Sequence, residues 1–228
     1  MRKKSNLGIF TILELLLVIA VIIILMSLLL PSLRKAKNKS QAIHCLGNQK
    51  QLIITALNYS DSFDGYFVFA NYTDGSCWGR IIKNAGIESS FEIFSCPSEK
   101  HKFVDYFKDY HYGLNIKTFG ATPVHASYKP QKVSAIISKG SPGLTIAFTD
   151  STPLSSVPTP NSDASHIIMY GALYPLDNAT FCYPTNIERH DNRANTVFLD
   201  GHASSMSITD LRDGMYWRPL QIGGVLYP

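Results

Sequence analysis

Acidic side chains are almost absent from the start of this 228-residue chain, and the imbalance is confined to that end. Of the 21 basic and 17 acidic residues in the whole chain, residues 1–50 hold eight basic ones and a single acid, Glu14, a net charge of +7. The remainder, 51–228, is slightly acidic, at −3, and has no basic stripe. This distribution excludes the basic surface typical of nucleic-acid-binding proteins, so no nucleic-acid partner is expected.

The chain also lacks the short motifs of common catalytic and nucleotide-binding sites. It contains no GxSxG nucleophile motif, no GxGxxG motif and no P-loop. We therefore expect a protein that is not an enzyme.

Cysteine is scarce, and all four cysteines follow residue 44. Neither a CxxC pair nor a zinc-finger spacing of Cys and His occurs, which argues against a structural zinc site. An even number of cysteines suits disulfides in an oxidising compartment, with three pairings possible, although unpaired or buried thiols are an open alternative. The candidate disulfide residues are Cys45, Cys77, Cys96 and Cys182.

The chain has one long hydrophobic run. From Ile9 to Leu30 the only polar residues are Thr11, Glu14 and Ser27, and a helix of this length covers roughly 33 Å, enough to cross a bilayer core of about 30 Å. A cleavable secretory signal has a shorter apolar region and an A-x-A-like site, whereas this run ends in LLLPSLRKAK. A transmembrane helix is predicted, and basic residues on both flanks leave its orientation open.

Glu14 is the unusual residue of this run. A carboxylate in lipid costs a few kcal/mol and therefore normally has a partner or a task. The segment contains no base to pair with it. A free amino terminus on a neighbouring copy of the same helix would be a suitable partner, and snorkelling to the membrane interface is the alternative.

The segment KxxNLGIFTILELLLVIA resembles the amino-terminal signal of type IV prepilins and type II secretion pseudopilins. If Phe10 is the first mature residue, Glu14 falls at the family's fifth position and Pro31 at its usual kinking proline. The chain departs from the pattern because the family's glycine, Gly8, stands two residues before Phe10, with Ile9 between. Cleavage between Ile9 and Phe10 keeps both matches in register; cleavage after Gly8 and absence of processing are the alternatives.

The resemblance also implies how the protein is processed, where it is located and with what it assembles. A prepilin peptidase would cut and methylate the chain at the cytoplasmic face of the bacterial inner membrane, leaving a single-pass protein with a periplasmic head. Thr11, Glu14 and Pro31 would serve assembly with other pilin or pseudopilin subunits on the assembly platform of a secretion system or a pilus. No cofactor is implied, apart from the calcium that related proteins often bind in a carboxy-terminal loop.

Three regions are predicted on this basis: a leader over 1–9, a long helix over 10–59 and a head over 60–228. The helix divides into a transmembrane part, 10–30, and an amphipathic part, 31–59, whose apolar positions recur every three to four residues. Turn residues Asp61, Asp64 and Gly65 end it. The repeating positions are Ala42, Cys45/Leu46, Gln49, Leu52/Ile53 and Ala56/Leu57.

The expected fold class is α+β, with the long helix packed on a small antiparallel sheet, as in pilins. VSAIIS (133–138) and LTIAFTD (144–150) read as strands around a turn, and IIMYGALY (167–174) is ambiguous. The stretch CLGNQKQLIITALNYSDSFDGYF resembles the C-x-x-N-L-K-Q…Y-x-x-D…G segment of a large branch of the pilin-like proteins.

A second motif lies in RHDNRANTVFLDGHASSM, residues 189–206. ANTVFL and HASSM flank Asp200-Gly201, a dipeptide that favours a type I′ turn and hence a hairpin. Nine residues separate His190 from Asp200-Gly201, and this spacing resembles a carboxy-terminal motif of one branch of pseudopilin-like proteins. We expect His190 to fix the loop before the strand and Asp200 to serve the turn.

Metal binding at this end is the alternative. His190, Asp200 and His202 could meet as ligands, and Asp191, Asp200, Asp210 and Asp213 offer oxygens for Ca²⁺ without any EF-hand spacing.

The predicted function is that of a pseudopilin-like structural subunit. The rival prediction is a membrane-anchored surface binding module that uses the pilin-type signal only for delivery and binds glycans or cargo through aromatic residues such as Trp78, Tyr110, Tyr112 and Trp217.

Overall fold

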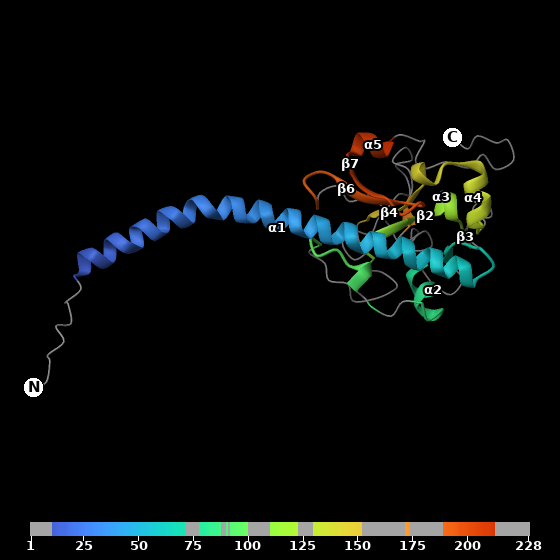
Figure 1. The fold of residues 1–228 in the computed structure, drawn as a ribbon, viewed down its shortest axis with the longest axis horizontal. Coiled ribbons are helices and arrows are strands. Elements are labelled where there is room, and N and C mark those ends of the chain that lie inside the picture. Colours follow the sequence, from blue (N-terminus) through green and yellow to red (C-terminus); the bar gives the residue numbers. More distant parts are fainter. Residues whose placement is uncertain are drawn as a thin grey trace, which may run out of the picture. The chain divides into compact units, whose positions relative to one another are not determined.

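The structure is a computed structural model in which described residues cover 11–71, 78–87, 90, 92–99, 110–122, 130–151, 172–173 and 189–212. Among the residues singled out above, Gly8, Ile9, Phe10, Cys77, Cys182, Asp213 and Trp217 lie outside these ranges. The chain divides into two compact units, Met1–Ser40 and Gln41–Pro228. Helix α1 (Ile12–Ser62) runs from the first unit into the second (Figure 1).

The first part of α1 is apolar as far as Leu33, and every residue from Thr11 to Ser40 is exposed. Among the described residues, α1 is the one helix that is long and apolar enough to cross a membrane. The predicted long apolar helix is therefore confirmed. Pro31 lies inside α1 and does not end it.

The second part of α1 is amphipathic and belongs to the core of the second unit. Its buried side chains follow the spacing expected from the sequence and extend it with polar members. Leu52, Ile53 and Ala56 are fully buried in the main hydrophobic cluster of the head. The buried residues are Cys45, Asn48, Gln49, Leu52, Ile53, Thr55, Ala56, Tyr59 and Ser60.

The end of α1 uses the turn residues that the sequence supplies. The Gly65 N–H donates to the Ser60 carbonyl over 2.9 Å, which closes the last turn. Asp64 and Gly65 both have positive φ, 53° and 76°, a conformation that asparagine, aspartate and glycine adopt most readily.

The head is built on a small mixed sheet in the strand order β5-β2-β4-β6-β7. β2, β4, β6 and β7 are antiparallel neighbours, and the two-residue β5 pairs parallel with β2. The α+β class is thus confirmed, with a parallel edge strand added to the expected antiparallel sheet. The strands are β2 (Tyr112–Asn115), β4 (Ile146–Asp150), β5 (Ala172–Leu173), β6 (Ala194–Phe198) and β7 (Ala203–Met206).

The remaining described elements are short. A second pair of strands, β1 and β3, is parallel. Their bounds, with those of the short helices, are β1 (Ala70–Asn71), α2 (Trp78–Asn84), η1 (Glu92–Phe94), α3 (Ile116–Phe119), β3 (Ala121–Thr122), α4 (Val133–Lys139), η2 (Pro142–Leu144) and α5 (Ile208–Arg212).

The strand predicted over 133–138 is wrong, because these residues form helix α4. Val133 and Ile136 pack against the core, while Ser134, Ile137 and Ser138 are exposed. An i, i+3 spacing brings the first two to one side of a helix, whereas a strand would have placed them on opposite faces. Of the second predicted strand, 144–150, residues Ile146–Asp150 form β4.

The predicted hairpin around Asp200-Gly201 is present, but its turn type differs. Only Gly201 has positive φ, 87°, whereas a type I′ turn needs it at Asp200 as well. The Gly201 N–H donates to the Phe198 carbonyl and the Phe198 N–H donates to His202, both over 2.9 Å. This is the three-residue loop in which a left-handed glycine follows a tight turn.

Candidate functional site

The first described turn of α1 holds two of the predicted assembly residues in direct contact. Glu14 Oε2 accepts hydrogen bonds from the Thr11 N–H and hydroxyl, each 2.9 Å long. The Glu14 N–H in turn donates to Thr11 Oγ1 over 3.3 Å. This reciprocal arrangement is a capping box, which satisfies backbone donors at a helix start. Glu14 Oε1 accepts no hydrogen bond from the described residues.

The other polar residues of the apolar segment are satisfied by their own helix. Ser27 Oγ donates to the Ile24 carbonyl over 2.7 Å, and Ser32 Oγ donates to Leu29 over 2.8 Å. Such bonds back to the preceding turn hide a hydroxyl from an apolar environment. Glu14 is therefore the one acidic group that the apolar segment carries and the one with an oxygen left open.

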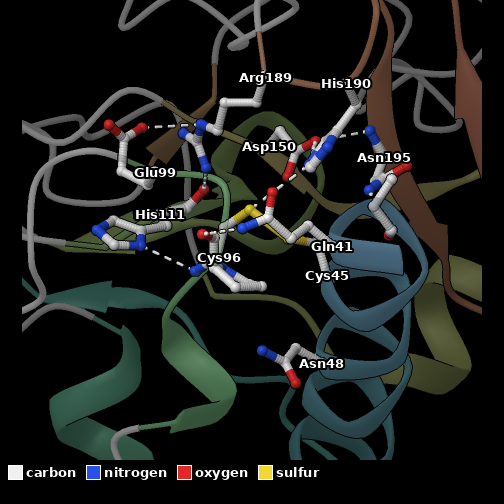
Figure 2. Close-up of a disulfide and its surroundings, with 12 residues drawn as sticks. Gln41, Cys45, Asn48, Cys96, Glu99, His111, Asp150, Arg189, His190 and Asn195 are labelled. Carbon is white, nitrogen blue, oxygen red and sulfur yellow. Dashed lines mark hydrogen bonds and ion pairs between the residues drawn. A yellow bond between two sulfur atoms is a disulfide. The ribbon is translucent and has the colours of Figure 1, made fainter. Parts of the chain in front are cut away.

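A cluster of buried polar side chains forms the second candidate site, inside the head (Figure 2). We call it the polar cluster: Gln49, Glu99, Asp150, Arg189, His190 and Asn195. Its members come from α1, β4, β6 and the loops that precede β2 and β6. Figure 2 shows five of these side chains near the disulfide and above it in this view: Glu99, Asp150, Arg189, His190 and Asn195.

Asp150 is the centre of the polar cluster and is fully buried. Its Oδ1 accepts from Gln49 Nε2 over 3.1 Å, and its Oδ2 accepts from the Asn195 N–H over 2.7 Å. Burial raises the pKa of Asp150 to about 7, although the positive charge of Arg189 and these hydrogen bonds oppose that rise. The carboxylate therefore ties α1 and β6 to the end of β4.

His190, the first residue of the carboxy-terminal motif, faces Asp150 in the interior. Its Nε2 lies 3.4 Å from Asp150 Oδ2 and 3.5 Å from Cys96 Sγ. Burial, followed by the charge of Arg189, lowers the pKa of His190 to about 4, so the neutral imidazole is the form that the site favours at neutral pH. His190 thus connects the loop before β6 to the core.

Arg189 extends the polar cluster on the other side. Its Nε pairs with Glu99 Oε2 at 2.9 Å, and both side chains are less than a tenth exposed. Its Nη1 donates to the His111 carbonyl over 3.0 Å. A buried guanidinium is tolerable because the carboxylate neutralises it and the carbonyl accepts a hydrogen bond from it.

The disulfide Cys45–Cys96 joins α1 to the loop after η1, with the two Cα atoms 5.2 Å apart. Hydrogen bonds on both sides strengthen this junction: Asn48 Nδ2 donates to the Glu92 and Ser95 carbonyls, and Gln41 Nε2 donates to Pro97. Both sulfur atoms lie within 4.8 Å of a His190 ring nitrogen. Sulfurs bonded to each other are not thiolates, so the oxidised pair cannot serve as metal ligands.

The proposed metal clusters at the carboxy-terminal end do not form among the described residues. Asp200 Oδ1 pairs with His202 Nδ1 at 2.6 Å on the hairpin loop, and His202 stacks on Phe198. Asp210 Oδ2 accepts from the Ser207 N–H and hydroxyl at the start of α5. The one group of three metal-ligand side chains in the described part of the chain is Cys45, Cys96 and His190.

Several residues of the polar cluster escape prediction from sequence. Asp150 ends a hydrophobic strand, which is a sign of a special role, and Gln49 stands at an otherwise apolar position of α1. Their partners are 101 and 45 positions away along the chain, so no local pattern connects them.

No family model, no curated protein and no solved structure matches this chain.

Proposed function

We propose that this protein is a pseudopilin-type structural subunit of a type II secretion or type IV pilus-like filament in the bacterial inner membrane. The observation that carries the proposal is the single helix α1, which presents an apolar surface from Thr11 to Leu33 and then enters the core of the head. A helix of this kind anchors the subunit in the bilayer before assembly and packs against other subunits afterwards. A repeating head-to-tail contact of this kind builds a filament.

The leader is removed before assembly. A prepilin peptidase cleaves between Ile9 and Phe10 and methylates the new amino terminus, which leaves Glu14 five positions into the mature chain. The amino group of Phe10 on one subunit then pairs with Glu14 on the next. Thr11 occupies only Oε2 of Glu14, and Oε1 stays available for that amine. Pairing offsets the cost of burying either charge alone.

The rival function, a surface binding module, loses the support of three of the four aromatic residues that were predicted to bind its ligand, namely those within the described ranges. Trp78 and Tyr112 are fully buried, and Tyr110 is 2% exposed. Trp78 and Tyr110 instead pack with Phe94 and Phe148 in the head core. Aromatic rings in such a core stabilise the head and are not available to a ligand.

Site-specific photo-cross-linking in cells tests the filament subunit directly. A photoreactive residue at Val21, on the exposed apolar helix, is expected to yield a ladder of self-linked oligomers. The same residue at Ile82, in the head core, is the control and should yield none.

The role of Glu14 is tested with two variants. Glu14→Ala should leave the amount of membrane-bound protein unchanged and reduce the ladder by at least about tenfold, because removing one partner of a buried pair costs about 3–5 kcal/mol. Thr11→Ala is the matched control: it removes half of the capping box, worth about 1 kcal/mol, and keeps the carboxylate. An unchanged ladder in Glu14→Ala contradicts the proposed pairing. Equal losses in both variants would mean that Glu14 acts only as a helix cap.

A further inference from the structure

A band of basic side chains follows the apolar surface of α1 without interruption. Arg34, Lys35, Lys37 and Lys39 stand directly after Leu33, and all four are exposed. None forms an ion pair with a described residue. Between Glu14 and Asp61 the chain has no acidic residue, so α1 itself supplies no neighbouring countercharge. We call these four residues the basic band.

The position of the basic band along the helix axis matches the layered structure of a bilayer. Ile12–Leu33 rises roughly 33 Å, which spans the hydrocarbon core of about 30 Å. Residues 34–39 then rise about 7.5 Å. The headgroup layer on each side of a bilayer has a similar thickness: a whole bilayer of about 40–45 Å exceeds its core of about 30 Å by about 10–15 Å, which leaves about 5–7.5 Å on each side.

The arrangement around the helix axis also favours a surrounding layer over a single partner. At about 100° per residue, Lys35, Lys37 and Lys39 lie at roughly 100°, 300° and 140° from Arg34, so the basic band covers more than half of the circumference. A protein or nucleic-acid partner on one side would contact only part of this band. Lipid headgroups, which surround a spanning helix, contact all of it.

We propose that Arg34, Lys35, Lys37 and Lys39 bind the headgroups of anionic phospholipids in the leaflet at the carboxy-terminal end of the span. Their aliphatic stems lie along the apolar boundary while the charged ends reach the phosphate groups. Each basic residue next to an anionic surface strengthens the association on the order of fivefold. The proposal requires only that the helix spans the membrane and does not depend on filament assembly.

Lipid selectivity of the full chain tests this site. The protein is reconstituted in phosphatidylcholine vesicles, and the association of spin-labelled phosphatidylglycerol is measured against that of spin-labelled phosphatidylcholine. The wild type is expected to prefer phosphatidylglycerol severalfold, and 0.5 M NaCl should weaken the preference because salt screens exposed charges.

Two triple variants that remove the same charge locate the preference. Lys35→Gln/Lys37→Gln/Lys39→Gln should lose most of it. Lys50→Gln/Lys83→Gln/Lys139→Gln removes three exposed lysines of the second unit and should retain it. No wild-type preference, or equal losses in the two variants, overturns the proposal. A preference unchanged in the first variant overturns it as well, because the lipid contact would then belong to other residues.

Discussion

The two parts of α1 share one continuous helix but differ in what surrounds them. From Thr11 to Ser40 every residue is exposed, whereas from Cys45 to Ser60 nine residues are buried against the head. A helix in water takes most of its stability from tertiary packing of one face, and the second part has such a face. The first part has an apolar surface on all sides as far as Leu33, and this stretch requires an apolar environment instead, either lipid or other helices.

The disulfide should produce the largest stability difference between the two parts, because it ties only the second part to the head. Replacing both Cys45 and Cys96 by Ser removes a cross-link between residues 51 positions apart. In the chain-entropy account this costs about 4 kcal/mol of the free energy of unfolding of the head. Urea unfolding followed by tryptophan fluorescence measures it, since Trp78 is buried in the core. An unchanged unfolding midpoint in the variant would contradict the proposed junction.

The same substitution made in each part of α1 should have very different effects. Leu52 is fully buried, and Leu52→Ala is expected to destabilise the head by about 2–5 kcal/mol through lost contacts and a cavity. Leu25 is 55% exposed, and Leu25→Ala should change the free energy of unfolding of the head by less than about 0.5 kcal/mol. Both are measured by urea unfolding in the same detergent. Similar losses in the two variants would show that the parts are not independent.

The polar cluster should make the stability of the head depend on pH in two opposing ways. The folded protein keeps the proton of Asp150 up to about pH 7, against an ordinary pKa of 3.8, so this residue contributes stability at low pH that is lost as pH rises from about 4 to 7. His190 has its pKa lowered from 6.5 to about 4 in the folded state, so its contribution is present above about pH 6.5 and is lost as pH falls toward 4.

Replacing either Asp150 or His190 should reveal the pH dependence of stability that the other residue contributes. Asp150→Asn should make stability rise with pH between about 4 and 6.5 more steeply than in the wild type. His190→Gln should make it fall with rising pH between about 4 and 7. Urea midpoints at four pH values across this window measure both slopes. Parallel slopes in the two variants would show that neither residue titrates as described.

Patterns along the sequence predict the elements whose determinants are local. The apolar run, the three-to-four-residue spacing after it and the turn residues Asp64 and Gly65 predict a helix close to Ile12–Ser62. The hairpin is predicted because Asp200-Gly201 separates two strand-like runs. Its turn type is not predicted, because Asp200-Gly201 is compatible with the two-residue type I′ turn and with the observed three-residue loop, both of which end in a glycine with positive φ.

Features that depend on contacts between residues far apart in the chain are the ones that the sequence does not predict. A six-residue run such as VSAIIS fits a strand or a helix equally, and contact of Val133 and Ile136 with the core selects the helix. The partner of His190 is Asp150, which lies 40 positions earlier in the chain, at the end of β4. Only the pairing of β4 with β6 brings the two residues together. The polar cluster therefore becomes visible only in the fold.

Mass spectrometry of the amino terminus of the protein purified from its native membrane is the most direct test of the proposed subunit. The proposal predicts a chain that begins at Phe10 with a methylated amino group, which would place Glu14 opposite the amine of a neighbouring copy. A chain that begins at Met1 in the assembled protein would contradict processing, and with it the pairing on which the filament is built.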